Sequence, residues 1–215
     1  MANYTCLLLD VDNTLLDFDA YVRTTMEQGF AHFGLPAYRP EMYHTFTAEN
    51  NKLWRQIEEG TLTFPELEKI RWNNVFAALD MDFDGVVFEK YFRTALHESA
   101  IPVNGARELL EALRGRYLLA AASNGPYEQQ LHRLALAGMK DFFDWFFISE
   151  RIGASKPSKL FFDEAFRQVN EGRETPILPE DTAIIGDSLT SDMAGGRQYG
   201  MKTCLLYTSD AADDK

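Results

Sequence analysis

Short apolar runs and helix-like segments alternate along most of the chain. The first run, residues 4–9, ends in acidic residues, as expected of a buried strand that opens into a loop at its C-terminal end. Alternation of this kind predicts a parallel α/β sheet, and right-handed crossovers would place helices on both of its faces. The expected strands are 4–9, 117–122, 145–148, 182–185 and 202–207, and the expected helices are 105–114, 127–137, 159–169 and 191–199.

The stretch from residue 17 to residue 99 breaks this alternation, because it contains four successive helical patterns and no convincing strand. Its apolar residues recur at helical spacing, and Thr63 ahead of Pro65 and Glu66 is typical of a helix start. We therefore predict an inserted helical domain whose aromatic residues form a bundle core. The predicted division is a sheet core of residues 1–16 and 100–207, a helical insertion of 17–99, and a disordered or foreign tail of 208–215.

Composition restricts the partners of this fold. The 215-residue chain carries 21 Lys and Arg against 33 Asp and Glu, a formal net charge of −12. Such a charge repels the phosphates of a nucleic acid polymer and an anionic membrane surface, so we expect neither as a partner. A small phosphorylated metabolite stays compatible, because a bound cation and a few basic groups can reverse the potential within one pocket. Monomer and homodimer both remain open.

Targeting signals and metal-binding cysteines are not apparent. No apolar stretch approaches the roughly 20 residues that cross a bilayer, and the N-terminus lacks a signal-peptide pattern, so we expect a cytoplasmic protein. Cys6 and Cys204 lie in short apolar runs and are interpreted as buried structural residues. The four histidines show no metal-ligand spacing, which argues against a zinc site. They are His32, His44, His97 and His132.

Two carboxylates follow the first predicted strand, in the sequence DVDNT at residues 10–14. Residues two apart on an extended strand point to the same side, so Asp10 and Asp12 would face one crevice at the carboxyl edge of the sheet. That edge, near the topological switch point, is where open α/β sheets bind ligands. Each Asp would also suit an Asx turn or a helix cap, and this segment alone does not decide between the two interpretations.

Two weaker signals follow later strands. Ser123, Asn124 and Gly125 separate the second expected strand from a helix, where a hydroxyl and backbone N–H groups would hold phosphate oxygens or, equally, cap the helix. Lys156 precedes Pro157, which restrains Lys156 toward extended backbone and would fix an ammonium near a phosphoryl group. A lone Lys-Pro pair is also ordinary in a loop before a helix.

The last signal is the segment 186–192, which follows the fourth expected strand. Asp187 at the strand end and Asp192 one helical turn on would converge on a hard cation, whose usual ligands are carboxylate and carbonyl oxygens. With Asp10 and Asp12 this places four carboxylates around one crevice. Because these groups would repel one another strongly without a cation, the sequence predicts a bound Mg²⁺.

Four such segments in one order, each after a predicted strand, are far more specific than any one of them. On these segments the chain resembles the haloacid dehalogenase (HAD) superfamily over nearly its whole length. The matching motifs are DVDNT at 10–14, SNG at 123–125, KP at 156–157 and GDSLTSD at 186–192. The resemblance implies a Rossmann-like parallel sheet with strand order 5-4-1-2-3 and an inserted helical cap that closes over the active site.

A narrower resemblance concerns the substrate. Residues 51–61 and 71–72, with SNG and ASKPSK, are similar to the nucleotidases that hydrolyse pyrimidine 5'-monophosphates. Trp54, Arg71 and Trp72 become candidates for contact with the leaving group, although each equally suits bundle packing or a surface ion pair. The implied strand order also separates the strands of Cys6 and Cys204 by about 9 to 10 Å, too far for a disulfide.

The resemblance further implies a chemical mechanism. Asp10 would attack phosphorus and form an aspartyl-phosphate, and Lys156 would neutralise Asp10 and the phosphoryl group. Asp12 would protonate the leaving oxygen and then activate the water that hydrolyses the intermediate. HAD dehalogenases lack an acid two residues after the first aspartate, so Asp12 favours phosphoryl transfer over attack on carbon.

The remaining roles are binding roles. By the same resemblance, Mg²⁺ would be held by Asp10, the backbone carbonyl of Asp12 and Asp187, with Asp192 orienting the site from behind. The phosphoryl oxygens would be bound by Thr14, Ser123 and Asn124.

The predicted activity is that of a Mg²⁺-dependent phosphatase acting on a nucleoside 5'-monophosphate. A sugar phosphate or phosphoglycolate as substrate stays an alternative, as does a phosphomutase, which would share these residues. A catalytically silent phosphate-binding module would carry a substituted nucleophile, acid or metal ligand, and none is substituted here. Superfamily members of this kind continue past the fifth strand, whereas this chain ends in TSDAADDK, which leaves open whether the natural C-terminus is present.

Overall fold

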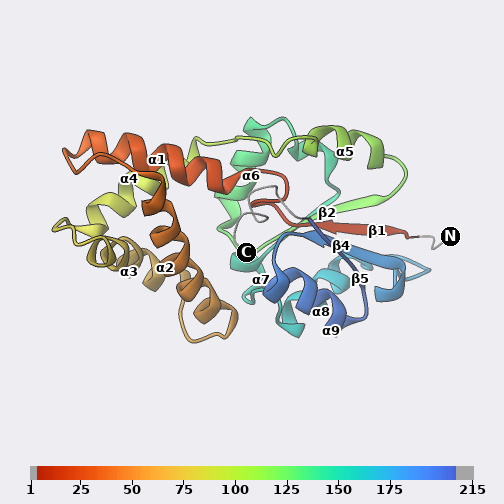
Figure 1. Ribbon diagram of the computed structural model, residues 1–215. Coiled ribbons are helices and arrows are strands. Elements are labelled where there is room, and N and C mark those ends of the chain that lie inside the picture. The colour runs from red at the N-terminus through yellow and green to blue at the C-terminus, as the bar shows by residue number, and fades with distance from the viewer. Residues whose placement is uncertain (1–3, 207–215) are drawn as a thin grey trace. The chain divides into compact units, whose positions relative to one another are not determined.

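The computed structural model describes residues 4–206, so Tyr207 and the predicted tail at 208–215 lie outside the described residues. The described chain folds into two compact units (Figure 1). The sheet unit consists of residues 4–17 and 100–206, and the helical unit of Phe18–Ser99.

Five parallel strands form the sheet unit in the order β3-β2-β1-β4-β5, which confirms the predicted topology. The central strand β1 is buried along its whole length, as expected of an apolar strand covered on both faces. Its last residue, Leu9, is level with Ala121 of β2 and Ile185 of β4, so the chain leaves these three strands at one edge. The strands are β1 Cys6–Leu9, β2 Leu118–Ser123, β3 Trp145–Ile148, β4 Thr182–Gly186 and β5 Lys202–Leu205.

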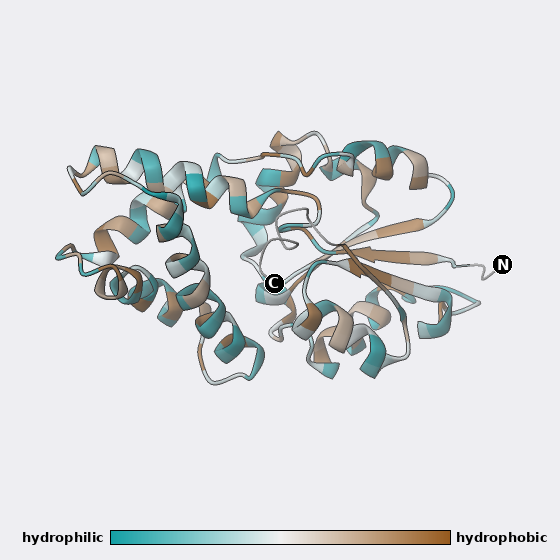
Figure 2. Ribbon diagram, in the orientation of Figure 1, coloured by the Kyte–Doolittle hydropathy of each residue, from teal (hydrophilic) through white to brown (hydrophobic). Residues whose placement is uncertain are grey.

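Alternate residues of β1 belong to two cores on opposite faces of the sheet. Leu7 and Leu9 pack with α5 and α6, and Cys6 and Leu8 pack with α8. In Figure 1, α5 lies above the sheet while α8 and α9 lie below it, and Figure 2 shows the strands largely in brown. The sheet-unit helices are α5 Ala106–Leu113, α6 Tyr127–Leu136, α7 Ser149–Ile152, α8 Lys159–Val169 and α9 Ala194–Tyr199, with short turns at η1 Lys140–Phe142, η2 Pro179–Asp181 and η3 Leu189–Met193.

The two cysteines differ in environment. Cys6 is buried, and that burial raises the pKa of its thiol to about 12. Cys204 is exposed, so the interpretation of both cysteines as buried is wrong for this residue. The reason is its position on β5, an edge strand in which Lys202 is likewise exposed. Both thiols are free.

Four helices build the helical unit around an aromatic core (Figure 1). The third begins directly after Thr63, as predicted, and the Glu66 carboxylate accepts hydrogen bonds from the backbone N–H and the hydroxyl of Thr63 at 2.9 and 2.6 Å. None of the helices among residues 4–206 combines the length and apolar character that a membrane crossing requires. The helices are α1 Phe18–His32, α2 Pro40–Glu58, α3 Phe64–Ala78 and α4 Gly85–His97.

Two of the three suggested leaving-group contacts are packed inside the helical unit. Trp72 is fully buried among aromatic rings. Arg71 is also buried, and its guanidinium forms two hydrogen bonds with the Glu89 carboxylate, so its ion pair is internal rather than exposed. Trp54 is half-buried and packs against Phe64. We interpret Arg71 and Trp72 as bundle residues.

Candidate active site

The carboxyl edge of the sheet gathers most of the predicted site residues. Asp10 follows β1 directly, Ser123 ends β2, and Asp187 follows β4. Lys156 comes from the loop between α7 and α8, and Asp192 from the turn η3. Because β1, β2 and β4 are parallel and end at the same edge of the sheet, these side chains converge on one place.

The Lys156 ammonium lies at the centre of the site and is 1% exposed. Its Nζ atom donates to a carboxylate oxygen of Asp10, to a carboxylate oxygen of Asp192 and to the backbone carbonyl of Ala122, each at 2.6 Å. These three acceptors match the three N–H donors of a lysine. Lys156 therefore fixes the Asp10 side chain at the end of β1.

Burial and mutual repulsion disfavour the charged forms of the carboxyl groups. Desolvation raises the pKa of Asp10, and Asp192 and Asp187 raise it further, while Lys156 opposes them. Desolvation and then the charge of Asp192 raise the pKa of Asp187 to about 7. Burial by itself would lower the pKa of Lys156, but the Asp10 and Asp192 carboxylates outweigh it and the pKa is raised.

The carboxylates of Asp10, Asp187 and Asp192 fit a hard divalent cation. One oxygen of each lies within 4.8 Å of the others, and a cation among them would relieve the repulsion that raises their pKa values. Both oxygens of Asp192 are already engaged, one by Lys156 and the other by the backbone N–H of Ser188 at 3.2 Å. Asp10 and Asp187 are thus the better placed ligands, and Asp192 holds the site together.

A glycine makes room for this arrangement. A Cβ atom on Gly186 would lie 2.2 Å from Oδ2 of Asp192, which is far closer than non-bonded atoms approach. The Asp192 carboxylate can therefore lie over the end of β4 only when residue 186 has no side chain.

Thr14 carries an unpartnered hydroxyl in the loop after β1. This side chain is 3% exposed, and its Oγ1 atom has no hydrogen-bond partner within residues 4–206. The loop turns tightly at Asn13, whose φ of 57° is one that asparagine tolerates better than most residues. A buried hydroxyl without a partner is costly, so this atom is well suited to a phosphoryl oxygen.

Asn124 has a different local role from Ser123. Its side-chain amide donates to the backbone carbonyl of Lys156 at 2.9 Å and accepts from the backbone N–H of Lys156 at 2.7 Å. Asn124 thus holds the lysine loop in place with its side chain, which leaves its backbone N–H as the group for a phosphoryl contact. The substrate-binding role of both residues stays a prediction.

Asp12 contacts two residues that the motifs did not identify. Arg133 and Gln130 project from α6 and hydrogen-bond to the two oxygens of its carboxylate. Both side chains are buried within the sheet unit. A sequence signal could have identified them. Gln130 and Arg133 are long polar residues three positions apart in the helix that follows SNG, and this spacing places both side chains on one face of that helix.

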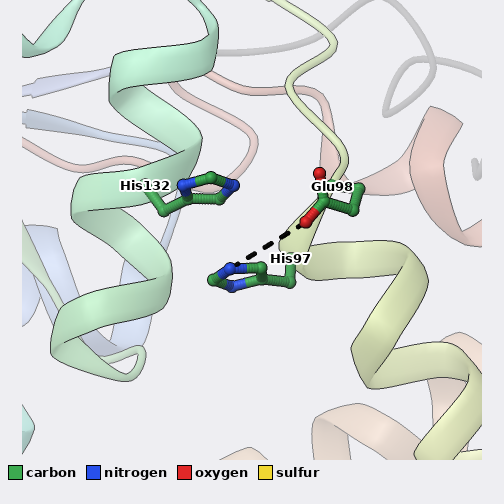
Figure 3. Close-up of side chains that lie close together, drawn as sticks. All are labelled: His97, Glu98 and His132. Atoms are coloured by element: carbon green, nitrogen blue, oxygen red, sulfur yellow. Dashed lines mark ion pairs between the residues drawn. The ribbon is translucent and has the colours of Figure 1, made fainter.

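Three of the four histidines belong to the helical unit and the fourth to the sheet unit. Figure 3 shows His97 and Glu98 at the end of α4, with a distance of 4.0 Å between the imidazole Nε2 and the carboxylate. Both belong to the helical unit, whereas His132, also drawn there, belongs to α6 of the sheet unit.

Sequence comparison assigns the family. The profile of haloacid dehalogenase-like hydrolases matches residues 4–200. The chain belongs to this family. The fold agrees, because a crystal structure of the HAD-hydrolase YfnB from Bacillus subtilis, described as bound to magnesium, superposes with a TM-score of 0.87. That match has 33% identity and covers 99% of this chain and 91% of the other.

Named relatives include two nucleotidases. The chain is 33% identical to the pyrimidine 5'-nucleotidase PynA of Streptococcus pneumoniae, over 93% of this chain and 82% of that protein. It is 30% identical to the pyrimidine 5'-nucleotidase YjjG of Escherichia coli, over 93% of this chain and 84% of that protein. The L-2-haloacid dehalogenase of Xanthobacter autotrophicus shares the fold with a TM-score of 0.72 at 15% identity, covering 97% of this chain and 80% of that one.

Proposed function

We propose that the protein is a Mg²⁺-dependent phosphatase that hydrolyses a small phosphomonoester, a pyrimidine nucleoside 5'-monophosphate, through an aspartyl-phosphate on Asp10. The observation that carries this proposal is the second carboxyl group, Asp12, held by two hydrogen-bond donors two residues after the Lys156-bound Asp10. Displacement at carbon needs no such acid, whereas loss of an alkoxide from phosphorus does. The named nucleotidase relatives support the substrate class.

In the first step, an oxygen of Asp10 forms a bond to phosphorus while the bond from phosphorus to the alcohol oxygen breaks. Asp12 gives its proton to that oxygen, so the product leaves as a neutral alcohol. Lys156 keeps Asp10 oriented and offsets negative charge as the two anions meet.

In the second step, water attacks the phosphorus of the aspartyl-phosphate. Asp12, now a carboxylate, takes a proton from that water, and the bond from phosphorus to Asp10 breaks. Inorganic phosphate leaves, and Asp10 is ready for another cycle. The same Asp12 group therefore serves once as acid and once as base.

The remaining residues bind. The unpartnered Thr14 hydroxyl, the Ser123 hydroxyl and the backbone N–H of Asn124 would hold phosphoryl oxygens. Asp10, Asp187 and the backbone carbonyl of Asp12 would hold Mg²⁺, with Asp192 orienting them, and the bound ion would neutralise charge on the transferring group. We assign substrate discrimination to the helical unit, residues 17–99, acting as a cap.

A hydrolysis panel tests the proposal. Pyrimidine nucleoside 5'-monophosphates should give higher kcat/KM values than purine nucleotides, hexose phosphates and phosphoglycolate when all are assayed at subsaturating concentration with Mg²⁺. A chelator should remove the activity, and excess Mg²⁺ should restore it. A hexose phosphate or phosphoglycolate that leads by more than tenfold, about 1.4 kcal/mol of transition-state binding, would rule out the nucleotidase assignment. If no phosphoester is hydrolysed, the phosphatase assignment itself is wrong.

A further inference from the structure

A hydrogen-bond network connects helix α6 to the site. Arg133 Nη1 donates to Asp12 Oδ1 at 2.6 Å and to Gln130 Oε1 at 3.0 Å. Gln130 Nε2 donates to Asp12 Oδ2 at 2.7 Å and to Ser123 Oγ at 2.7 Å. The network thus spans the loop after β1, the end of β2 and one face of α6.

The directions of these hydrogen bonds are determined by Arg133. A guanidinium only donates, so the group of Gln130 that faces it must be the amide oxygen. The amide nitrogen of Gln130 then faces Asp12 and Ser123, and each of its two N–H groups has one acceptor. The reversed amide would bring two donors together at Arg133 and two acceptors together at Asp12, so only one orientation is favourable.

This orientation fixes the hydroxyl of Ser123 in turn. Its oxygen accepts from Gln130 and also from the backbone N–H of Gly125 at 3.1 Å. Two accepted bonds occupy both lone pairs of a hydroxyl oxygen, so its O–H group is left to donate. A phosphoryl oxygen accepts such a donation.

Burial argues that the network has a positioning role. Gln130 is 0% exposed and Arg133 is 1% exposed, and a buried guanidinium is expensive unless its donors are satisfied. The acceptor that partly compensates Arg133 is the carboxylate of Asp12, whose side chain is 33% exposed. Both carboxyl oxygens accept from buried donors, so Asp12 has one defined orientation, and each oxygen keeps a further lone pair that can carry the proton Asp12 transfers.

We propose that Gln130 and Arg133 are positioning residues that aim the Asp12 carboxyl at the leaving oxygen and the Ser123 hydroxyl at the phosphoryl group. The inference rests on the proposed phosphatase function. The effect of losing either positioning residue depends on the leaving group. An alkoxide must be protonated by Asp12 as it departs, whereas p-nitrophenolate leaves without a proton, so a misplaced Asp12 should slow the alkyl ester selectively.

The test compares kcat/KM for uridine 5'-monophosphate and p-nitrophenyl phosphate, because kcat/KM reports the steps up to formation of the aspartyl-phosphate. Arg133→Met should lower the value for the nucleotide at least about 30-fold, and that for the aryl ester by no more than about threefold. Gln130→Met also releases the Ser123 hydroxyl, which faces the phosphoryl group of both esters, so it should lower both values, and the nucleotide value at least about tenfold more than the aryl value. Arg133→Lys should recover part of the loss, because an ammonium can still donate to Asp12. Asp12→Asn should show the largest selective loss, because it removes the proton donor itself.

Two further variants separate positioning from general damage. Gln129→Met is the matched control, because Gln129 is also buried on α6 yet makes no hydrogen bond to Asp12, so it should leave the ratio of the two kcat/KM values unchanged. Gly125→Ala should reproduce the selective loss, because its Cβ would lie 2.7 Å from Nε2 of Gln130.

Failure of the positioning role and failure of the proposed phosphatase function would give different results. Equal losses on both esters in Arg133→Met and Gln130→Met, with or without a lower melting temperature, would assign these residues a structural role and overturn the inference while the phosphatase stands. A wild-type protein that hydrolyses neither ester would instead overturn the proposed function, and the positioning role with it.

Discussion

Asp10→Asn is expected to abolish turnover of every phosphoester while leaving the fold intact. The amide has almost the volume of the carboxylate but cannot form the acyl-phosphate, so the covalent route is closed. Replacing a catalytic nucleophile typically lowers kcat by about 10⁴-fold or more. The check is steady-state kinetics on purified protein, with circular dichroism and thermal melting to verify the fold.

The fold should survive because Lys156 keeps two of its three acceptors, Asp192 and the carbonyl of Ala122. Asp163→Asn is a matched control on a half-exposed aspartate that pairs with Lys159, and it should retain full activity. Asp10→Asn with more than a trace of the wild-type rate would remove Asp10 from the role of nucleophile.

Lys156→Met is expected to have the largest effect on stability. Removing the ammonium leaves the buried carboxylates of Asp10 and Asp192 without their shared partner. Breaking a buried ion pair from one side costs about 3–5 kcal/mol. For a chain of this size that corresponds to a melting temperature lower by roughly 6–20 °C, measured in chelator so that no metal ion takes over the role of the lysine.

The control for this variant is Lys159→Met. Lys159 also pairs with an aspartate, Asp163, but its side chain is 78% exposed, and exposed pairs contribute about 1 kcal/mol or less. Its melting temperature should therefore stay near that of the wild type. If Lys156→Met melts no earlier than Lys159→Met, the buried pairing of Lys156 with Asp10 and Asp192 does not stabilise the protein.

The central strand and a helix start could be predicted from the sequence because both obey local rules. The run ending at Leu9 is continuously apolar, as a central parallel strand must be, and Thr63 with Glu66 marks a helix start through a local hydrogen-bond pattern. The order of the strands, in contrast, was predicted from the resemblance to the HAD superfamily and not from the hydrophobic periodicity. Asp10 and Asp187 follow neighbouring parallel strands that end at the same edge of the sheet, so their convergence is a consequence of the parallel register.

Other features depend on three-dimensional contacts that no local pattern carries. Gln130 and Arg133 look like ordinary surface residues of an amphipathic helix until α6 is placed against the loop of Asp12. Cys204 lies in an apolar run, yet its exposure depends on β5 being at the edge of the sheet. The side chain of Asn124 is engaged by the backbone of Lys156, 32 residues away in the sequence.

The central claim is that phosphate is transferred to Asp10, and covalent trapping tests it most directly. Asp12→Asn mixed with p-nitrophenyl phosphate and Mg²⁺ should form the aspartyl-phosphate, because this leaving group needs no proton, and should hydrolyse it slowly, because the base is missing. The sample is quenched in acid, digested and examined by mass spectrometry. One added phosphoryl group is expected on the peptide that contains Asp10. Release of p-nitrophenolate with no phosphorylated peptide, or with the phosphoryl group on another residue, would contradict it.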